Sequence, residues 1–186
     1  MKKIYIAGCG GMLGEAFYQI FKDDFILKCT DIDVNEKWIS SLDFRRVEDY
    51  KKDVFSFNPD FLFHIGAYTD IEFCELNPDD TYITNTESVK NAVKIANQLS
   101  IPILYISSAG IFDGKKNYYD ETDKPNPYGH YAKSKYLGEK HVIECAKKYL
   151  VCRAGWMMGG GPEKEKKFIN KIIQQIKGGK KELFIV

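Results

Sequence analysis

The stretch from Lys2 to Asp31 decides the fold: KKIYIAGCGGMLGEAFYQIFKDDFILKCTD. A short apolar run at 4–7 leads into a glycine-dense turn. A segment with helical character follows at 12–21, and a second apolar run occupies 25–29. Apolar runs separated by a helix indicate a strand–helix–strand unit, the building block of parallel sheets.

The turn in this unit carries three glycines at a spacing of three, Gly8, Gly11 and Gly14. A tight turn requires one glycine, because a Cβ would block its dihedral angles. A second lets backbone N–H groups approach a pyrophosphate at the positive end of a helix, and a third lets helix and strand pack closely. Asp31 ends the second apolar run, where a carboxylate accepts hydrogen bonds from an adenosine ribose. This context favours dinucleotide binding over a merely structural turn.

The remaining chain continues the alternation of apolar runs and helices. Asn77-Pro78 followed by two aspartates is a typical helix start. The residues at 33–43 read as irregular, with at most a short helix at 38–42. Strands are expected at 61–65, 101–107, 149–153 and from 182 to 186, and helices at 47–57, 77–100, 128–148 and 163–177. The pattern predicts an α/β protein, a doubly wound parallel sheet of the Rossmann type, with ligands beyond the carboxyl ends of the strands.

Composition narrows the classes of partner. The 186 residues carry a net charge of +1 with no long run of one sign, which gives a nucleic acid or an anionic membrane no electrostatic support. Lys164, Lys166 and Lys167 alternate with glutamates and read as a solvated helix face. No apolar stretch approaches the length of a membrane span.

Cysteine and histidine usage argues against a metal site. The five cysteines are scattered, form no CxxC and do not cluster with the three histidines. Reduced, mostly buried thiols in a cytoplasmic protein are therefore expected. His64 lies inside an apolar run, and we expect a packed, hydrogen-bonded histidine there rather than a base.

A second informative stretch is 125–139, PNPYGHYAKSKYLGE. Tyr131 and Lys135 are four residues apart on an expected helix and share a face. A lysine one turn away, together with an oxidised nicotinamide, would favour the phenolate and lower the pKa of Tyr131. The pair could then exchange a proton with a carbonyl or alcohol oxygen during hydride transfer. Standing alone, the pair would read as a surface tyrosine beside a solvated lysine.

With these motifs in place, the whole chain resembles the extended short-chain dehydrogenase/reductase family, and within it the dTDP-4-dehydrorhamnose reductases. The similarity rests on AGCGGMLG at 7–14, LDFRR at 42–46, NPDFLFHIGAYTDIEFCE at 58–75, ITN at 83–85, YISSAGIFDG at 105–114, YAKSK at 131–135 and CRAGWMMGGG at 152–161.

The resemblance implies a set of cofactor-binding residues. Asp31 implies NAD(H) rather than NADP(H), because it would repel a 2′-phosphate, although Arg45 and Arg46 leave room for NADP(H). The positions that match cofactor contacts are Gly8, Gly11, Met12, Leu13, Gly14, Asp31, Asp43, Phe44, Gly66, Ala67, Tyr68, Tyr131 and Lys135.

The resemblance also implies catalytic and substrate-binding residues. Tyr131 matches the proton donor, Lys135 its partner and Ser108 the hydroxyl that bonds the substrate oxygen. Asn85 matches an asparagine that shapes the active-site helix, with an ordinary polar helix residue as the alternative. Arg153 and Trp156 match positions bordering the sugar nucleotide, and a core role is the alternative for Trp156.

Two departures from the reductase pattern stand out. The reductases usually carry Ser-Thr-Asp-Tyr where this chain has Ser107-Ser108-Ala109-Gly110, which is closer to sugar-nucleotide epimerases and dehydratases. The relatives also continue well beyond Val186. We therefore expect a dinucleotide-binding domain at 1–155 with the Tyr/Lys pair, and at 156–186 the start of a substrate-binding region that is largely missing.

Three functions are compatible with these residues. The first is NAD(P)H-dependent reduction of a nucleotide-linked 4-keto-6-deoxysugar in deoxysugar synthesis for surface polysaccharide. The second is an NAD-dependent epimerase or dehydratase, against which Ala109 argues because dehydration calls for an acid there. The third is a cofactor-binding regulatory subunit without turnover. A homodimer built from paired helices is frequent in this superfamily.

Overall fold

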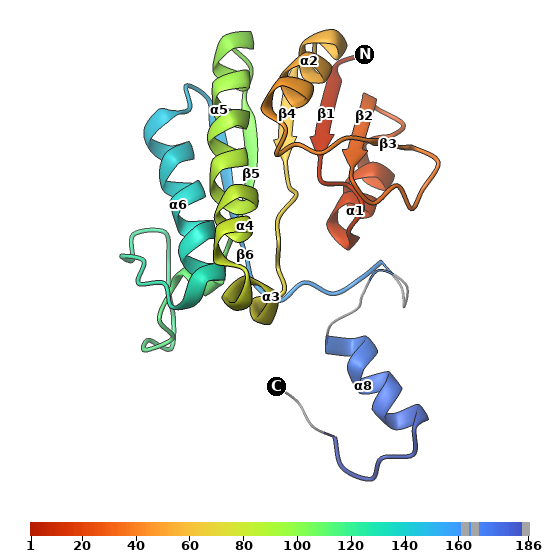
Figure 1. Cartoon of the computed structure of the whole chain (residues 1–186), viewed down its shortest axis with the longest axis vertical. Helices are drawn as coiled ribbons and strands as arrows, with labels where there is room; N and C mark the ends of the chain where they lie inside the picture. Colours follow the sequence, from red (N-terminus) through yellow and green to blue (C-terminus); the bar gives the residue numbers. More distant parts are fainter. Residues whose placement is uncertain (161–163, 165–167, 184–186) are drawn as a thin grey trace.

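The computed structural model describes residues 1–160, 164 and 168–183, and its centre is a parallel sheet in the order β3-β2-β1-β4-β5-β6 (Figure 1). Every adjacent pair of strands runs parallel. The strands are β1 Lys3–Ala7, β2 Ile26–Asp31, β3 Ile39–Ser41, β4 Phe61–His64, β5 Ile103–Ser108 and β6 Tyr149–Ala154. The predicted α/β fold with a parallel sheet is confirmed.

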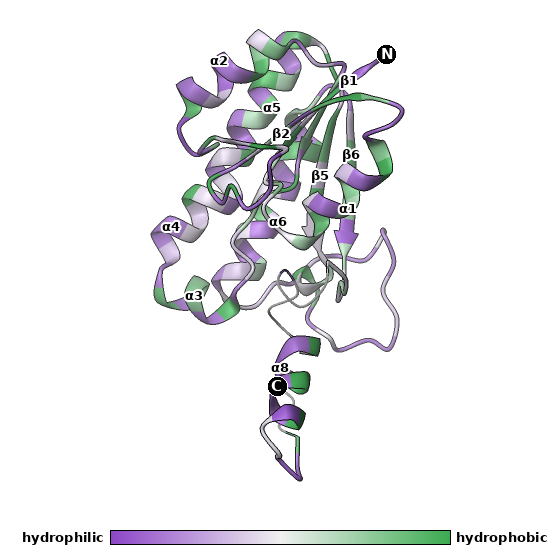
Figure 2. Cartoon of the chain, turned by 90° about the vertical axis from the view of Figure 1, so that its right-hand side faces the viewer, coloured by the Kyte–Doolittle hydropathy of each residue, from purple (hydrophilic) through white to green (hydrophobic). Residues whose placement is uncertain are grey.

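Helices cover both faces of this sheet, as the doubly wound prediction requires. Seen with the sheet edge-on, α1 lies on the opposite side from α2 (Figure 2). The described helices are α1 Met12–Phe21, α2 Val47–Phe57, α3 Ile71–Leu76, α4 Pro78–Tyr82, the π-helix η1 Ile83–Glu87, α5 Ser88–Leu99, the 3₁₀ turn η2 Ala109–Ile111, α6 Gly129–Cys145 and α8 Phe168–Lys177.

The two faces of the sheet make two separate hydrophobic cores. Alternate side chains of a strand point to opposite faces. Tyr5 accordingly joins a buried cluster with residues of α2 and α5, such as Val54 and Val93. Ile4 and Ile6 join a second cluster, against which the aromatic side chains of α1 pack. Burial on both sides explains why β1 reads as an unbroken apolar run.

One local expectation was wrong. The segment at 38–42 contains strand β3, not a short helix, because Ile39 is buried and pairs with Cys29 of β2. The helix expected over 77–100 is present as α4, η1 and α5 in succession, and its middle part is a π-helix. In addition, α3 was not expected; the Asp70 side chain caps it by accepting a hydrogen bond from Phe73 N.

The chain after β6 leaves the sheet. Helix α8 lies apart from the strands in both views (Figures 1 and 2), and Gly179 ends it with a φ of +73°. Residues 182–183 are not in a strand, and the rest of the strand expected there lies outside the described residues. Within the described residues, no helix combines the length and apolar character that crossing a bilayer requires.

Lys164 corrects the expected solvated lysine face. Its side chain is only 10% exposed, and its Nζ lies 2.9 Å from Glu15 Oε2 and 3.1 Å from Glu36 Oε1. Two carboxylates from separate segments hold this ammonium group, which compensates for its burial. Lys166 and Lys167 lie outside the described residues.

Candidate active site

The turn after β1 has a backbone that only glycine fits. Gly8 has a φ of +96°, and a Cβ built on it would lie 2.1 Å from the Cα of Gly66. A Cβ on Gly14 would lie 2.3 Å from the Cys9 carbonyl oxygen, so α1 and the turn touch through this glycine. The predicted tight turn and close packing are therefore both present.

Gly11 differs from its two neighbours, because a Cβ built on it meets nothing within 4 Å. It is the N-cap of α1 and offers no side-chain cap for the first-turn N–H groups. The N-terminal N–H groups of a helix have no intrahelical partner and favour an anion. In that first turn, Leu13 packs into the second core cluster and Met12 approaches Gly160. Open space thus adjoins the positive end of α1.

Asp31, the last residue of β2, organises this turn. Its Oδ2 accepts a hydrogen bond from Gly10 N at 2.8 Å, and its Oδ1 accepts one from Asp33 N at 2.9 Å. A carboxylate has about four acceptor positions, so each oxygen retains capacity for a further donor. The carboxylate is therefore fixed beside the glycine turn at the carboxyl end of the sheet.

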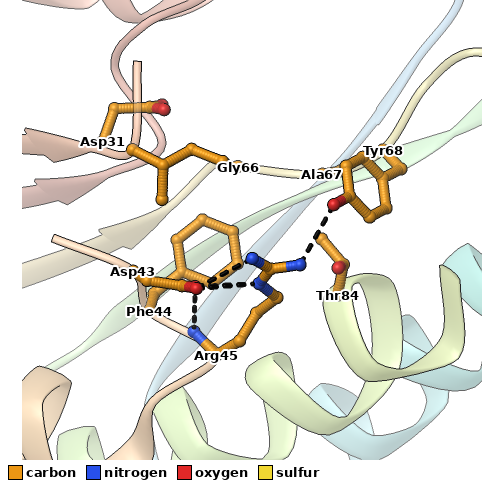
Figure 3. A pocket seen from close by; sticks show the side chains of 9 residues that line it. Asp31, Asp43, Phe44, Arg45, Gly66, Ala67, Tyr68 and Thr84 are labelled. Carbon is orange, nitrogen blue, oxygen red and sulfur yellow. Dashed lines mark hydrogen bonds and ion pairs between the residues drawn. The ribbon is translucent and has the colours of Figure 1, made fainter. Parts of the chain in front are cut away.

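A recess of about 90 Å³ opens next to Asp31. Figure 3 shows residues from the ends of β2 and β4 and from the segment after β3 converging on it. Six predicted cofactor residues line it together with three that were not predicted to do so; in chain order they are Asp31, Ile32, Asp43, Phe44, Arg45, Gly66, Ala67, Tyr68 and Thr84.

Arg45 links residues that line this recess through hydrogen bonds. Its guanidinium donates to both carboxylate oxygens of Asp43, with the shortest N–O distance 2.8 Å, and its Nη1 donates to Tyr68 Oη at 3.0 Å (Figure 3). The same Nη1 lies 3.2 Å from Asp80 Oδ1. These hydrogen bonds lower the pKa of Asp43. Asp43 belongs to the same LDFRR motif as Arg45, whereas the contacts of Arg45 with Tyr68 and Asp80 could not be read from that motif.

Asn85 connects the recess to α6. The side chain is fully buried in η1. Its amide accepts from Tyr68 N at 2.8 Å, donates to Tyr68 O at 3.0 Å and donates to Ser134 Oγ at 3.1 Å. Ser134 in turn donates to the carbonyl of Tyr131. π-Helical turns are frequent at functional sites. The predicted shaping of the active-site helix stays a prediction, but the buried side chain and its three hydrogen bonds argue against the alternative of an ordinary polar helix residue.

Ser108 and Tyr131 meet at the carboxyl end of β5. Ser108 is 8% exposed, and its Oγ accepts a hydrogen bond from Gly110 N at 3.0 Å. Burial raises the pKa of Tyr131, and a hydrogen bond with Ser108 partly opposes this rise. A Cβ built on Gly110 would lie 3.2 Å from Ser108 Oγ and 3.9 Å from Tyr131 Cε1, so the structure places the two predicted side chains beside each other.

Lys135 lies one turn further along α6 and is buried. Its Nζ sits 4.5 Å from the centre of the Tyr105 ring, and burial lowers its pKa to about 7. The lowering of the Tyr131 pKa that we expect from this lysine together with an oxidised nicotinamide stays a prediction. Burial removes water from both groups, so the phenol and the ammonium each shift toward the neutral form.

The residues predicted to border the substrate behave differently from one another. Arg153 is bound by Glu139 through its Nε and Nη2, with the shortest distance 2.7 Å. Trp156 is 72% exposed, which excludes the core role. Glu139, which was not predicted, is 1% exposed and eight residues after Tyr131 on α6. The spacing of four residues between Tyr131, Lys135 and Glu139 could have indicated that Glu139 shares their face of α6.

His64 is a packed histidine, as predicted. It is fully buried in β4, 3.2 Å from Tyr50 Oη and 3.1 Å from Ser88 Oγ, and burial lowers its pKa to about 3. Within the described residues, no three His, Cys, Asp or Glu side chains gather as a metal site would require. Three of the five cysteines are buried, and Cys145 is exposed.

Comparison with protein families identifies relatives of this chain. The profile described as RmlD substrate binding domain matches residues 1–186. The chain belongs to this family. The dTDP-4-dehydrorhamnose reductase of Aggregatibacter actinomycetemcomitans is 29% identical over 160 residues, which are 86% of this chain and 53% of that protein. The chain thus spans about half the length of this curated relative.

Other relatives extend the comparison. Methionine adenosyltransferase 2 subunit beta of Bos taurus is 31% identical over 147 residues, which cover 77% of this chain and 43% of that protein. The crystal structure of dTDP-4-dehydrorhamnose reductase from Yersinia enterocolitica superposes with a TM-score of 0.84 at 36% identity, over 97% of this chain and 61% of that one. The Bacillus anthracis reductase, solved in complex with NADP, gives 0.82 at 26%, over 98% and 61%.

Proposed function

We propose that this chain supplies the cofactor-binding and proton-donating part of an oxidoreductase that reduces a nucleotide-linked 4-keto-6-deoxysugar. The observation that carries the proposal is that the Ser108 and Tyr131 side chains both lie beside Gly110 at the carboxyl end of β5, with Lys135 buried on the next turn of α6. The similarity to dTDP-4-dehydrorhamnose reductases supports the substrate class. Deoxysugar synthesis for surface polysaccharide is the setting we infer.

The residues around the glycine turn fit a nicotinamide dinucleotide. The open space at Gly11 and the uncapped N-terminus of α1 suit a pyrophosphate. The Asp31 carboxylate suits an adenosine ribose, and the recess lined by Asp43 and Phe44 suits the adenine. When bound, the nicotinamide supplies the hydride.

NAD(H) is the cofactor we favour. Asp31 would repel a 2′-phosphate, and the Arg45 guanidinium is already engaged by Asp43, Tyr68 and Asp80. NADP(H) is the alternative, because the Bacillus anthracis relative was solved with NADP.

The proposed chemistry assigns one role to each residue at the catalytic end. Ser108 and Tyr131 hydrogen-bond the keto oxygen, and Tyr131 donates the proton as the alkoxide forms. Lys135 stabilises the phenolate that this transfer leaves. Asn85 holds Tyr68 and α6 in register. We keep Trp156 at the border of the sugar nucleotide, whereas its contact with Glu139 leaves Arg153 less free for that task.

Two other functions have support of their own. The Ser107-Ser108-Ala109 sequence resembles that of sugar-nucleotide epimerases and dehydratases, which would keep NAD bound between turnovers. The other alternative is a cofactor-binding regulatory subunit without turnover, and the match to a protein named as a subunit, methionine adenosyltransferase 2 subunit beta, is compatible with it.

The test is NADH oxidation by the purified protein with a dTDP-4-keto-6-deoxysugar, followed at the nicotinamide absorbance band. We expect Tyr131→Phe to lower kcat by about 10²- to 10⁴-fold, because the phenol is the proton donor. Tyr118→Phe, at a 77% exposed position in the loop before α6, serves as the matched control. Undiminished consumption by Tyr131→Phe would contradict the assignment.

The same preparation separates the other two functions. Cofactor released when the untreated protein is denatured supports the epimerase. Tight NAD(H) binding without turnover of any sugar nucleotide supports the subunit.

A further inference from the structure

Three chemically active side chains follow one another along a single face of α6. Tyr131, Lys135 and Glu139 recur every fourth residue, so they stand one above another toward the sheet. The first two belong to the proposed reaction. Glu139 has no part in it, yet its side chain is 1% exposed, which is rare for a carboxylate unless it is paired.

Arg153 of β6 is the partner of Glu139. Its Nη2 lies 2.7 Å from Glu139 Oε1, and its Nε lies 3.2 Å from each carboxylate oxygen. The guanidinium carbon also lies 5.3 Å from the centre of the Phe112 ring. Arg153 pairs in register with Ser107, the neighbour of Ser108. The ion pair therefore ties α6 to the strand beside the one that presents the predicted catalytic serine.

The Glu139–Arg153 ion pair also bears on the charge of Lys135. The ionisable groups that interact with Lys135 are Tyr105 of β5, His64 of β4 and Glu139 of its own helix, and Tyr131 lies one turn before it on the same face. The tyrosines and His64 are held neutral by burial. Among these groups, the Glu139 carboxylate is the one that favours the charged lysine. Arg153 of β6 hydrogen-bonds that same carboxylate.

We propose that Glu139 and Arg153 form a positioning pair that sets the charge of Lys135. Arg153 holds the carboxylate against β6, so that Lys135 faces a partly neutralised counter-ion and exchanges its proton more readily than a fully paired lysine. The link to turnover rests on the proposed function, because it is Lys135 that supports Tyr131 there.

The experiment is an NMR titration of lysine ε-carbons in the full chain, with the Lys135 signal assigned by its loss in Lys135→Met. We expect Glu139→Gln to lower the pKa of Lys135 by about one or more, because it removes the carboxylate and leaves the Arg153 cation. Arg153→Gln should raise that pKa by a similar amount, because it frees the full negative charge. Glu144→Gln, at a 57% exposed carboxylate on the same helix, should leave it unchanged.

The double variant Glu139→Gln/Arg153→Gln guards against loss of folding in either single variant. It removes both charges and retains amides, so the pKa of Lys135 should return to within about 0.5 of the wild-type value. If Lys135 titrates alike in all folded variants, or if both single variants move it in one direction, the proposal is overturned.

The titration needs neither cofactor nor sugar, so its failure is distinct from failure of the proposed function. If the reductase assay succeeds, the pH at which kcat changes should move with the NMR value in each variant. If no sugar nucleotide is reduced, the NMR result still decides the role of the pair.

Discussion

The glycine turn after β1 and the face of α6 that carries Tyr131, Lys135 and Glu139 both lie at the candidate site, but different kinds of contact hold them in place. In the turn, each constraint is a contact between backbones: Gly8 against Gly66 and Gly14 against Cys9. On α6, each constraint joins side chains from distant segments, such as Glu139 to Arg153 and Ser134 to Asn85. A contact between backbones permits only glycine at that position. A contact between side chains requires only that each buried polar group has a partner.

This difference determines how each region tolerates change. A Cβ built on Gly8 would lie 2.1 Å from the Cα of Gly66, so a side chain there forces the two backbone segments apart. A buried polar side chain can be replaced by another that makes the same hydrogen bonds without loss of the fold. If the replacement changes its charge, the ionisation of neighbouring groups changes. We therefore expect substitutions in the glycine turn to change mainly the free energy of unfolding. Substitutions on α6 should in addition change the pKa of neighbouring groups.

The largest effect should follow Gly8→Val. Its side chain would enter the backbone of Gly66, and its φ of +96° is strained for a β-branched residue. We expect a loss of about 4 kcal/mol or more in the free energy of unfolding, measured by urea denaturation. Gly155→Ala is the matched control, because a Cβ there meets nothing within 4 Å, and it should unfold like the wild type. A stable Gly8→Val protein would remove the steric argument.

The same contrast explains what the sequence could predict. The strand–turn–helix unit was readable because spacing along the chain reflects local sterics, and all strands of the sheet except β3 were expected. β3 was missed because Ile39 alone is buried in a three-residue strand, and one apolar residue makes no periodic pattern.

The candidate site divides in the same way. Asp31 and Gly66 were expected at one edge of the sheet because each ends or follows an apolar run, whereas Phe44 was expected from the family resemblance, and all three line one recess. The contacts of Arg45 with Asp80 and of Glu139 with Arg153 were not expected, because these partners are 35 and 14 residues apart along the chain. The interrupted helix around Asn85 also has no signature, since the π-turn responds to contacts with Tyr68 and α6.

The next largest effect concerns pH and Lys135. Its pKa is about 7 in the folded chain and about 10.5 when exposed, so between these values the unfolded chain binds more protons. The free energy of unfolding should therefore rise with pH across that window, by on the order of 2–4 kcal/mol from this group. Lys135→Met should flatten the rise in urea titrations from pH 6.5 to 10, whereas exposed Lys133→Met should preserve it. Parallel curves for Lys135→Met and wild type would contradict the burial of a titrating ammonium.

A smaller loss is expected for Asn85→Ala. The change leaves Tyr68 N and O without their buried partners and should cost about 2–3 kcal/mol in thermal or urea unfolding. Because Asn85 also bonds Ser134, we expect kcat to fall more than the KM for NADH rises. Asn91→Ala on α5 is the control at a half-buried asparagine. A loss of stability with an unchanged kcat would confine Asn85 to a structural role.

The smallest effect should come from Arg45→Lys, and it tests whether the recess behaves like the turn or like α6. A lysine cannot reproduce the fork that bonds Asp43, so we expect about 1 kcal/mol of stability to be lost, because the pair is partly exposed. Binding of NADH and NADPH should weaken by the same few-fold factor, since Arg45 supports the recess through Asp43 and Tyr68 and is not free for a 2′-phosphate. Arg46→Lys should leave both affinities unchanged. Fluorescence titration with each cofactor decides the matter: a loss confined to NADPH would make Arg45 a phosphate ligand and overturn the preference for NAD(H).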